Sequence, residues 1–174
     1  NEGKLNSAKI VFEAILKRDP GNKSAFSFQQ LILEKLSGTK TRELLNSADT
    51  NFKNKNYAQA RADYQKVLAI NPSISSAKEG IQASLLAQSE QERLQGSDLA
   101  KRGKPFEAIK MFMASLRTLP SNAQATADLN AIRSFESSNM KTYVETGINH
   151  YNERNYNSSI EIFENALLVV PNNK

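Results

Sequence analysis

The sequence predicts an all-α fold, an α-solenoid of helical hairpins with lengthened first helices or an extra helix in each unit. Four segments place a small residue, an aromatic residue and then a proline at offsets of 0, +4 and +12, and the prolines are about 50 residues apart. No segment shows the alternation typical of a strand. Stacked helical repeats bury a long thin core and leave an extended surface, which suits binding better than catalysis.

Each repeated segment is expected to form one amphipathic helix. Its apolar residues recur at steps of three and four, as Tyr57, Ala60, Tyr64 and Val67 do, so one face is buried. The aromatic residue fills the space between neighbouring helices, and the proline ends the helix because it lacks a backbone donor. We expect these helices at Leu5–Lys17, Tyr57–Ile70, Phe106–Leu119 and Tyr156–Val170, closed by Pro20, Pro72, Pro120 and Pro171.

A second amphipathic segment precedes each of the last three helices and ends in a polar turn. In each of these segments a small residue lies 12 positions before the small residue of the following helix. This constant offset predicts helical hairpins whose arms come closest at the small residues. The expected first arms include Glu43–Lys53, Arg93–Arg102 and Met140–Glu153, with Ala48, Gly96 and Gly147 at the close approach.

The hairpin resembles the tetratricopeptide repeat, whose two antiparallel helices carry a small residue in the first, an aromatic residue in the second and a closing proline. The residues that match best are Leu44, Ala48, Tyr57, Ala60, Tyr64, Leu68 and Pro72, and then Tyr143, Gly147, Tyr156, Ile160, Phe163, Ala166, Leu167 and Pro171. We therefore interpret the chain as one array, expected to be a fragment of a longer protein. Its units are a partial unit at about 1–22, and then 23–72, 73–121 and 122–174.

The spacing is longer than the family's usual period of about 34 residues, so each interval holds about four to five extra helical turns. We expect unusually long first arms, sometimes split in two. Ser37–Thr39 is expected to break the first, and Ser89–Arg93 to be a bend or a solvent-exposed middle in the second. The third is expected to be one helix over about 122–153, because its apolar residues keep one phase. Arrays with this period resemble those of large bacterial proteins, which implies a cell-envelope setting on the periplasmic side.

The amino-acid composition excludes several kinds of metal site and catalytic site. The chain has 174 residues, no cysteine and one histidine, His150, so thiolate metal sites, disulfides and histidine catalysis are excluded. No nucleophile elbow or phosphate-binding loop occurs. We expect a protein that is not an enzyme and takes no cofactor or metal. The basic cluster Lys101–Lys104 is read as a helix end with its glycine cap, with docking of an acidic partner as the alternative.

The resemblance implies a ligand groove lined by the first arms. Carried over by position, the outward-facing residues there are Arg42, Asn46, Asp49, Lys53, Glu90, Arg93, Ser97, Lys101, Lys141, Glu145, Asn149 and Asn152. Their mixture of acids, amides and bases suits an extended peptide or a partner's loop. Leu45 and Asp49 stand where a carboxylate-gripping subgroup has lysine and asparagine, so chaperone-tail binding is not expected. Tyr151 is expected in the core between repeats, with an exposed binding residue as the alternative.

The predicted function is therefore a non-catalytic scaffold for a protein or peptide partner. One alternative is a structural segment that self-associates through its open ends, and another is a docking arm for an enzyme elsewhere in the parent chain. Nucleic acid is not expected as a partner despite the net charge of +5, because the aromatic residues fall on buried stripes. No apolar run is long enough to span a membrane.

Overall fold

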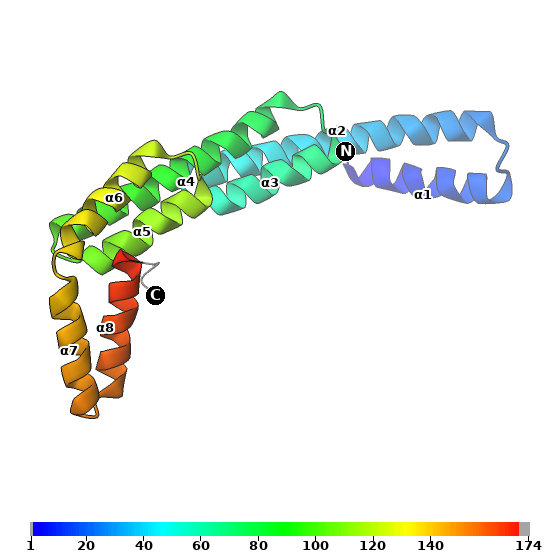
Figure 1. Ribbon diagram of the computed structural model, residues 1–174. Helices are drawn as coiled ribbons and strands as arrows, with labels where there is room; N and C mark the ends of the chain where they lie inside the picture. Colours follow the sequence, from blue (N-terminus) through cyan, green and yellow to red (C-terminus); the bar gives the residue numbers. More distant parts are fainter. Residues whose placement is uncertain (1, 171–174) are drawn as a thin grey trace. The chain divides into compact units, whose positions relative to one another are not determined.

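The structure, a computed structural model, describes residues 2–170, and all their regular elements are α-helices. The helices are α1 (Glu2–Arg18), α2 (Lys23–Lys53), α3 (Tyr57–Ile70), α4 (Ser75–Lys101), α5 (Pro105–Thr118), α6 (Ala123–Ser137), α7 (Met140–Asn152) and α8 (Tyr156–Val169) (Figure 1). Chain neighbours pack as pairs, such as α2 with α3 and α7 with α8. The predicted all-α fold of successive hairpins is confirmed.

Two compact units divide the chain, Asn1–Ser84 and Leu85–Lys174, and the boundary falls inside α4. The first unit has its core around Ala48, Tyr64 and Val67. The second has its core around Ile109 and Phe112 of α5, with residues of α6 and α8 packed against them. No helix among the described residues is both long and apolar enough to cross a membrane.

The four helices predicted from the proline pattern are confirmed as α1, α3, α5 and α8. α3 has the predicted bounds, and the others agree to within a few residues at each end. Helices α1, α3 and α5 end two residues before Pro20, Pro72 and Pro120, because proline disfavours helical backbone in the residue that precedes it. Pro171, the predicted end of the last helix, lies outside the described residues, as do Asn172, Asn173 and Lys174.

The break predicted at Ser37–Thr39 is wrong, because α2 continues through it for 31 residues. The Thr39 hydroxyl donates to the Lys35 carbonyl at 3.1 Å, which lets the threonine remain in the helix. Gly38 costs the helix about 1 kcal/mol relative to alanine. This cost is small compared with the packing of α1 and α3 against the two parts of α2.

The exposed middle predicted at Ser89–Arg93 is wrong for Ser89, although Gln91 is exposed. α4 is continuous there, and Ser89 is fully buried. The Ser89 hydroxyl donates to the backbone carbonyl of Ser115 on α5 at 3.0 Å, and the Ser115 hydroxyl donates to the carbonyl of Ser89 at 2.8 Å. The Asn122 amide donates to the Ser89 hydroxyl oxygen at 2.8 Å. Ser89 is therefore buried against polar partners, whereas Glu90, Glu92 and Arg93 are only partly buried.

The single helix predicted over about 122–153 is wrong, because α6 and α7 are separated at Ser138 and Asn139. The hydroxyls of Ser137 and Ser138 donate to the carbonyls of Ser134 and Phe135, three residues back. Such local side-chain bonds compete with the helical pattern, and two serines in succession supply them here. The expectation that one long arm would be split is confirmed, but at 138–139 instead of 37–39.

The turns that join α2 to α3, α4 to α5 and α7 to α8 have the same backbone geometry. Lys55, Gly103 and Arg154 have φ of 62°, 72° and 62°, and each lies five residues before Ala60, Ala108 or Ser159. In each turn the N–H of the left-handed residue bonds three residues back, and the next N–H bonds five residues back. This pair of bonds is the Schellman motif, which favours glycine at the left-handed position. Two of the three turns adopt it with a long cationic residue instead.

Aromatic rings lie directly on helix glycines, two of which, Gly96 and Gly147, were predicted where two arms come close. A Cβ added to Gly96 would meet the ring of Phe112 at 2.7 Å, and one added to Gly147 would meet the ring of Phe163 at 2.7 Å. In the first unit, a Cβ on Gly80 would overlap the ring of Tyr64. Glycine at these positions therefore allows the ring to pack against helix backbone.

A buried carboxylate joins α2 to α3. Asp63, only 3% exposed, accepts hydrogen bonds from Ser47 and Asn51 of α2 at 2.8 and 3.1 Å. It also accepts from Gln59 at 3.1 Å and from the Lys66 ammonium at 2.8 Å. The hydrogen bond from Lys66 is the main cause that lowers the pKa of Asp63, and it outweighs the opposing effect of burial.

Candidate protein-interaction surface

In the first unit, the predicted site residues form one exposed row on α2. Arg42, Asn46, Asp49 and Lys53 are separated by steps of four, three and four, so they share one face of the helix. The hydroxyl of Tyr64 donates to the Asp49 carboxylate at 2.6 Å. Burial, together with this bond, raises the pKa of Tyr64 to about 12. Asp49 is therefore fixed in orientation, and the other three side chains are available for a partner.

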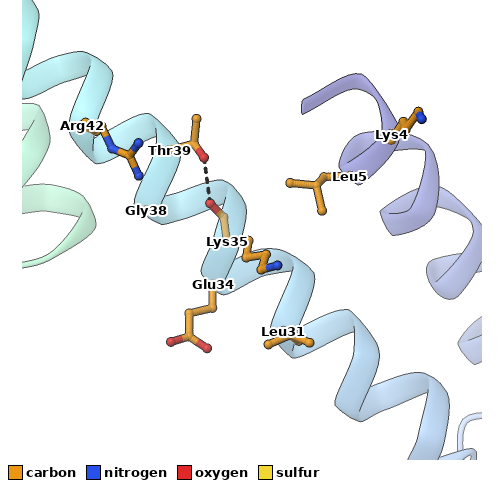
Figure 2. A pocket seen from close by; sticks show the side chains of 8 residues that line it. All are labelled: Lys4, Leu5, Leu31, Glu34, Lys35, Gly38, Thr39 and Arg42. Carbon is orange, nitrogen blue, oxygen red and sulfur yellow. Dashed lines mark hydrogen bonds between the residues drawn. The ribbon is translucent and has the colours of Figure 1, made fainter. Parts of the chain in front are cut away.

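Next to this row, a groove of about 740 Å³ lies between α1 and α2. Figure 2 shows Leu5 extending from α1 towards α2, with Arg42 and Leu31 at opposite ends of the labelled part of α2. The lining residues are Lys4, Leu5, Leu31, Glu34, Lys35, Gly38, Thr39 and Arg42. Of these, Arg42 was predicted as a site residue, and the rest were missed because they lie upstream of the expected first arm. The signal that could have found them was the basic and aliphatic mixture at 31–42.

In the second unit, Arg93 is held inside an ion-pair network. Its guanidinium contacts Glu90 at 2.7 Å and Asp128 of α6 at 2.7 Å, and its side chain is 15% exposed. The hydrogen bond to Glu90 is the largest cause that raises the pKa of Arg93, followed by the one to Asp128. The same pair lowers the pKa of Glu90. Arg93 therefore ties α4 to α6 and has little surface left for a ligand.

A second groove, of about 600 Å³, lies among α4, α5, α6 and α7 within this unit. It includes the predicted residue Ser97 and, unpredicted, Phe135, Glu136, Asn139 and Tyr143. Phe135 lies in the segment expected to be a single long helix, where the apolar residues share one phase, but it is 72% exposed near the end of α6. Glu136 is 5% exposed and accepts from the Tyr143 hydroxyl at 2.5 Å and from the Asn139 amide at 3.1 Å.

The remaining predicted residues are exposed, but they do not line this groove. Lys141, Glu145, Asn149 and Asn152 lie along α7, and Lys101 lies in the last turn of α4. Lys141 and Glu145 form a surface pair at 3.8 Å, of a kind that contributes a few tenths of a kcal/mol. Within the second unit, the predicted residues therefore form separate rows on α4 and α7.

The structure also tests what the sequence predicted for Tyr151 and for the cluster Lys101–Lys104. Tyr151 is not in the core, because it is 61% exposed, with its ring 5.6 Å from that of Tyr156. Tyr156 is the first residue of α8 and is itself half exposed. The cluster Lys101–Lys104 ends α4 with Gly103 in the left-handed conformation, as expected for a helix cap. His150 lies 3.8 Å from Glu153 at the surface of α7.

Residues 44–74 match the family model of the tetratricopeptide repeat. The match begins in the last part of α2, includes the turn at Lys55 and all of α3, and ends at Ile74. It includes Asn46, Asp49 and Lys53 of the exposed row. No curated protein matches the chain.

Proposed function

We propose that this chain is a non-catalytic interaction scaffold that binds an extended peptide or a loop of a partner protein along the first arms of its hairpins. Tetratricopeptide repeats generally bind proteins, and the match covers the hairpin that carries the exposed row on α2. The observation that carries the proposal is this row. Asn46 can both donate to and accept from a peptide backbone, and Arg42 and Lys53 add charged donors at either side.

We also propose the long-period division into units 1–22, 23–72, 73–121 and 122–174. It is supported by where the first arms begin, since α2, α4 and α6 start at Lys23, Ser75 and Ala123. Its lengthened period is the reason to propose a bacterial envelope setting. Fractionation of cells that produce the tagged protein tests that setting, and a wholly cytoplasmic distribution would contradict it.

The test of binding is a selection of displayed peptides against the whole chain. Enriched peptides should bind the variant Asn46→Ala/Lys53→Ala about tenfold more weakly or worse, because each truncation removes a contact to the ligand. The matched control is Gln65→Ala/Lys78→Ala, which removes one amide and one ammonium from exposed positions of α3 and α4. Circular dichroism should show unchanged helicity in both variants. Peptides that bind all three proteins equally would reject the α2 row as the site.

Self-association is the second candidate function, and one observation favours it. Ile160 and Leu167 on α8 are 56% and 54% exposed, whereas Ile109, the counterpart of Ile160 in α5, is fully buried. Light scattering should then show a mass that rises with concentration and returns to the monomer value in Ile160→Glu/Leu167→Glu. A wild-type chain that stays monomeric at high concentration would reject this candidate.

A further inference from the structure

We infer that the groove between α1 and α2 is a subsite for an acidic peptide segment that carries an aliphatic side chain between its carboxylates. This inference rests on the proposed function, which it makes more specific. The groove lies within the first unit, and one of its lining residues, Arg42, is also the first member of the exposed row on α2.

The lining of the groove is strongly biased in charge. Three cations, Lys4, Lys35 and Arg42, and one carboxylate, Glu34, line the groove. Figure 2 shows Lys35 on the side towards α1, Glu34 directed the other way, and the Lys4 side chain directed away from α2. None of the three cations forms an ion pair within residues 2–170. Neighbours outside the groove on the same helices are paired, as Lys9 is with Glu13 at 3.6 Å and Lys40 with Glu43 at 3.9 Å. The groove therefore holds uncompensated positive charge.

The apolar lining and open space of the groove indicate which kind of ligand side chain would lie between the ligand's carboxylates. Leu5 and Leu31 supply apolar side chains from the two helices, and Leu31 is half exposed. Gly38 leaves open space, since a Cβ added there would meet nothing within 4 Å. An aliphatic side chain of a ligand can bury apolar surface against the two leucines while its neighbouring carboxylates approach Lys35 and Arg42. Arg42 can receive a carboxylate through two parallel hydrogen bonds.

A protein segment fits these features better than a nucleic acid does. Single-stranded nucleic acids are bound through aromatic side chains on which bases stack, and none of the lining residues is aromatic. The Thr39 hydroxyl oxygen can accept hydrogen bonds from the backbone N–H groups of an extended chain, and the Arg42 guanidinium can donate to its carbonyl groups. The occupant we infer is therefore an internal acidic segment, recognised by its side chains.

The experiment measures binding of three capped peptides to the whole chain by fluorescence anisotropy. Each is N-acetylated and C-amidated, and each alternates leucine with glutamate, glutamine or lysine. We expect the glutamate peptide to bind at least tenfold more tightly than the glutamine peptide, and the lysine peptide not to bind. Its affinity should fall as salt is added, because exposed charges are screened. Equal binding of the glutamate and glutamine peptides would overturn the inference.

Variants of the groove locate the binding. Lys35→Glu/Arg42→Glu should weaken the glutamate peptide at least tenfold, whereas Lys78→Glu, which makes the same change at an exposed position of α4, should have no effect. Gly38→Leu should block the groove without disturbing the helix, and Gly3→Leu is its control, since both glycines are helical and open. Unchanged binding by Lys35→Glu/Arg42→Glu or by Gly38→Leu would overturn the assignment.

Two outcomes separate this inference from the proposed function. If selected peptides bind through Asn46 and Lys53 but the glutamate peptide does not bind, the subsite is rejected and the scaffold function stands. If no peptide binds anywhere, both are rejected. A dimer of the chain alone that Lys35→Glu/Arg42→Glu dissociates would assign the groove to a second copy and would also overturn the inference.

Discussion

The ring of Phe112 lies so close to Gly96 that a single added Cβ would meet it at 2.7 Å. α4 and α5 therefore approach each other through the one residue that has no side chain, and Phe112 is buried at this contact. The same relationship holds between Gly147 of α7 and Phe163 of α8. These contacts decide which substitutions the hairpins tolerate.

Gly96→Ala should destabilise the chain by about 1 to 3 kcal/mol, because Phe112 must move against packed neighbours. The free energy of unfolding in urea measures this change. Gly38→Ala is the matched control, and it should stabilise by about 1 kcal/mol, since alanine is the better helix former and nothing obstructs its methyl group. Equal effects of the two substitutions would contradict the close contact at Gly96.

The left-handed turns predict a gain in stability from glycine. Lys55→Gly and Arg154→Gly should each raise the free energy of unfolding by about 1 kcal/mol, because a side chain disfavours positive φ. Gly103→Ala should lower it by a similar amount at the equivalent position. As a control, Lys40→Gly in the interior of α2 should cost about 1 kcal/mol. Thermal melting of the four variants provides the comparison, and a loss of stability in Lys55→Gly would rule out the left-handed geometry.

Asp63 should make the first unit sensitive to acid. Its folded pKa is lowered from 3.8, so the stabilisation it provides is complete above that value and is lost as the pH falls through the folded pKa. Asp63→Asn should flatten the dependence of stability on pH in this acidic range. At neutral pH, Asp63→Ala should cost about 2 to 3 kcal/mol, because Ser47, Asn51 and Gln59 lose their acceptor. Denaturant curves at a series of pH values test both effects, and an unaltered acid profile in Asp63→Asn would count against the hydrogen-bonded carboxylate.

Two tyrosines should govern the response to alkali. The pKa values of Tyr64 and Tyr143 are each raised from 10.0 to about 12, first by burial and then by hydrogen bonds to Asp49 and Glu136. The folded chain holds these protons more tightly, so their stabilisation is full below pH 10.0 and declines as the pH rises towards about 12. Tyr64→Phe and Tyr143→Phe should each remove part of this decline. Tyrosinate absorbance of the folded chain follows the ionisation, and ionisation of both groups near their ordinary pKa would refute the prediction.

The fold could be predicted from the sequence wherever a local signal acts alone. The bounds of α3 followed from the aromatic and small residues of Tyr57–Ile70 and from Pro72 beyond them. The helix breaks could not be predicted in this way. Glycine at 38 is tolerated inside a long packed helix, whereas Ser137 and Ser138 form competing side-chain bonds to backbone carbonyls. Which of two polar runs interrupts a helix depends on those bonds and on packing, not on composition.

The candidate interaction surface also has a part that could be predicted from the sequence and a part that could not. The exposure of Arg42, Asn46, Asp49 and Lys53 followed from helical periodicity, which places them on one face of α2. The burial of Arg93 could not be foreseen, because its partner Asp128 lies 35 residues away in the sequence, on another helix. The groove between α1 and α2 was missed for a related reason, since it depends on which part of the long α2 packs beside α1.

The buried hydroxyls of Ser89 on α4 and Ser115 on α5 constrain how one helix can slide along the other. An apolar seam of similar residues would tolerate a displacement by one helical turn, because any methyl group can replace another. Here each hydroxyl donates to a backbone carbonyl of the opposite helix at 2.8 to 3.0 Å, and Asn122 adds a third donor. A shifted alignment would leave these groups unpaired away from water, so a small polar cluster selects one longitudinal register for the two helices.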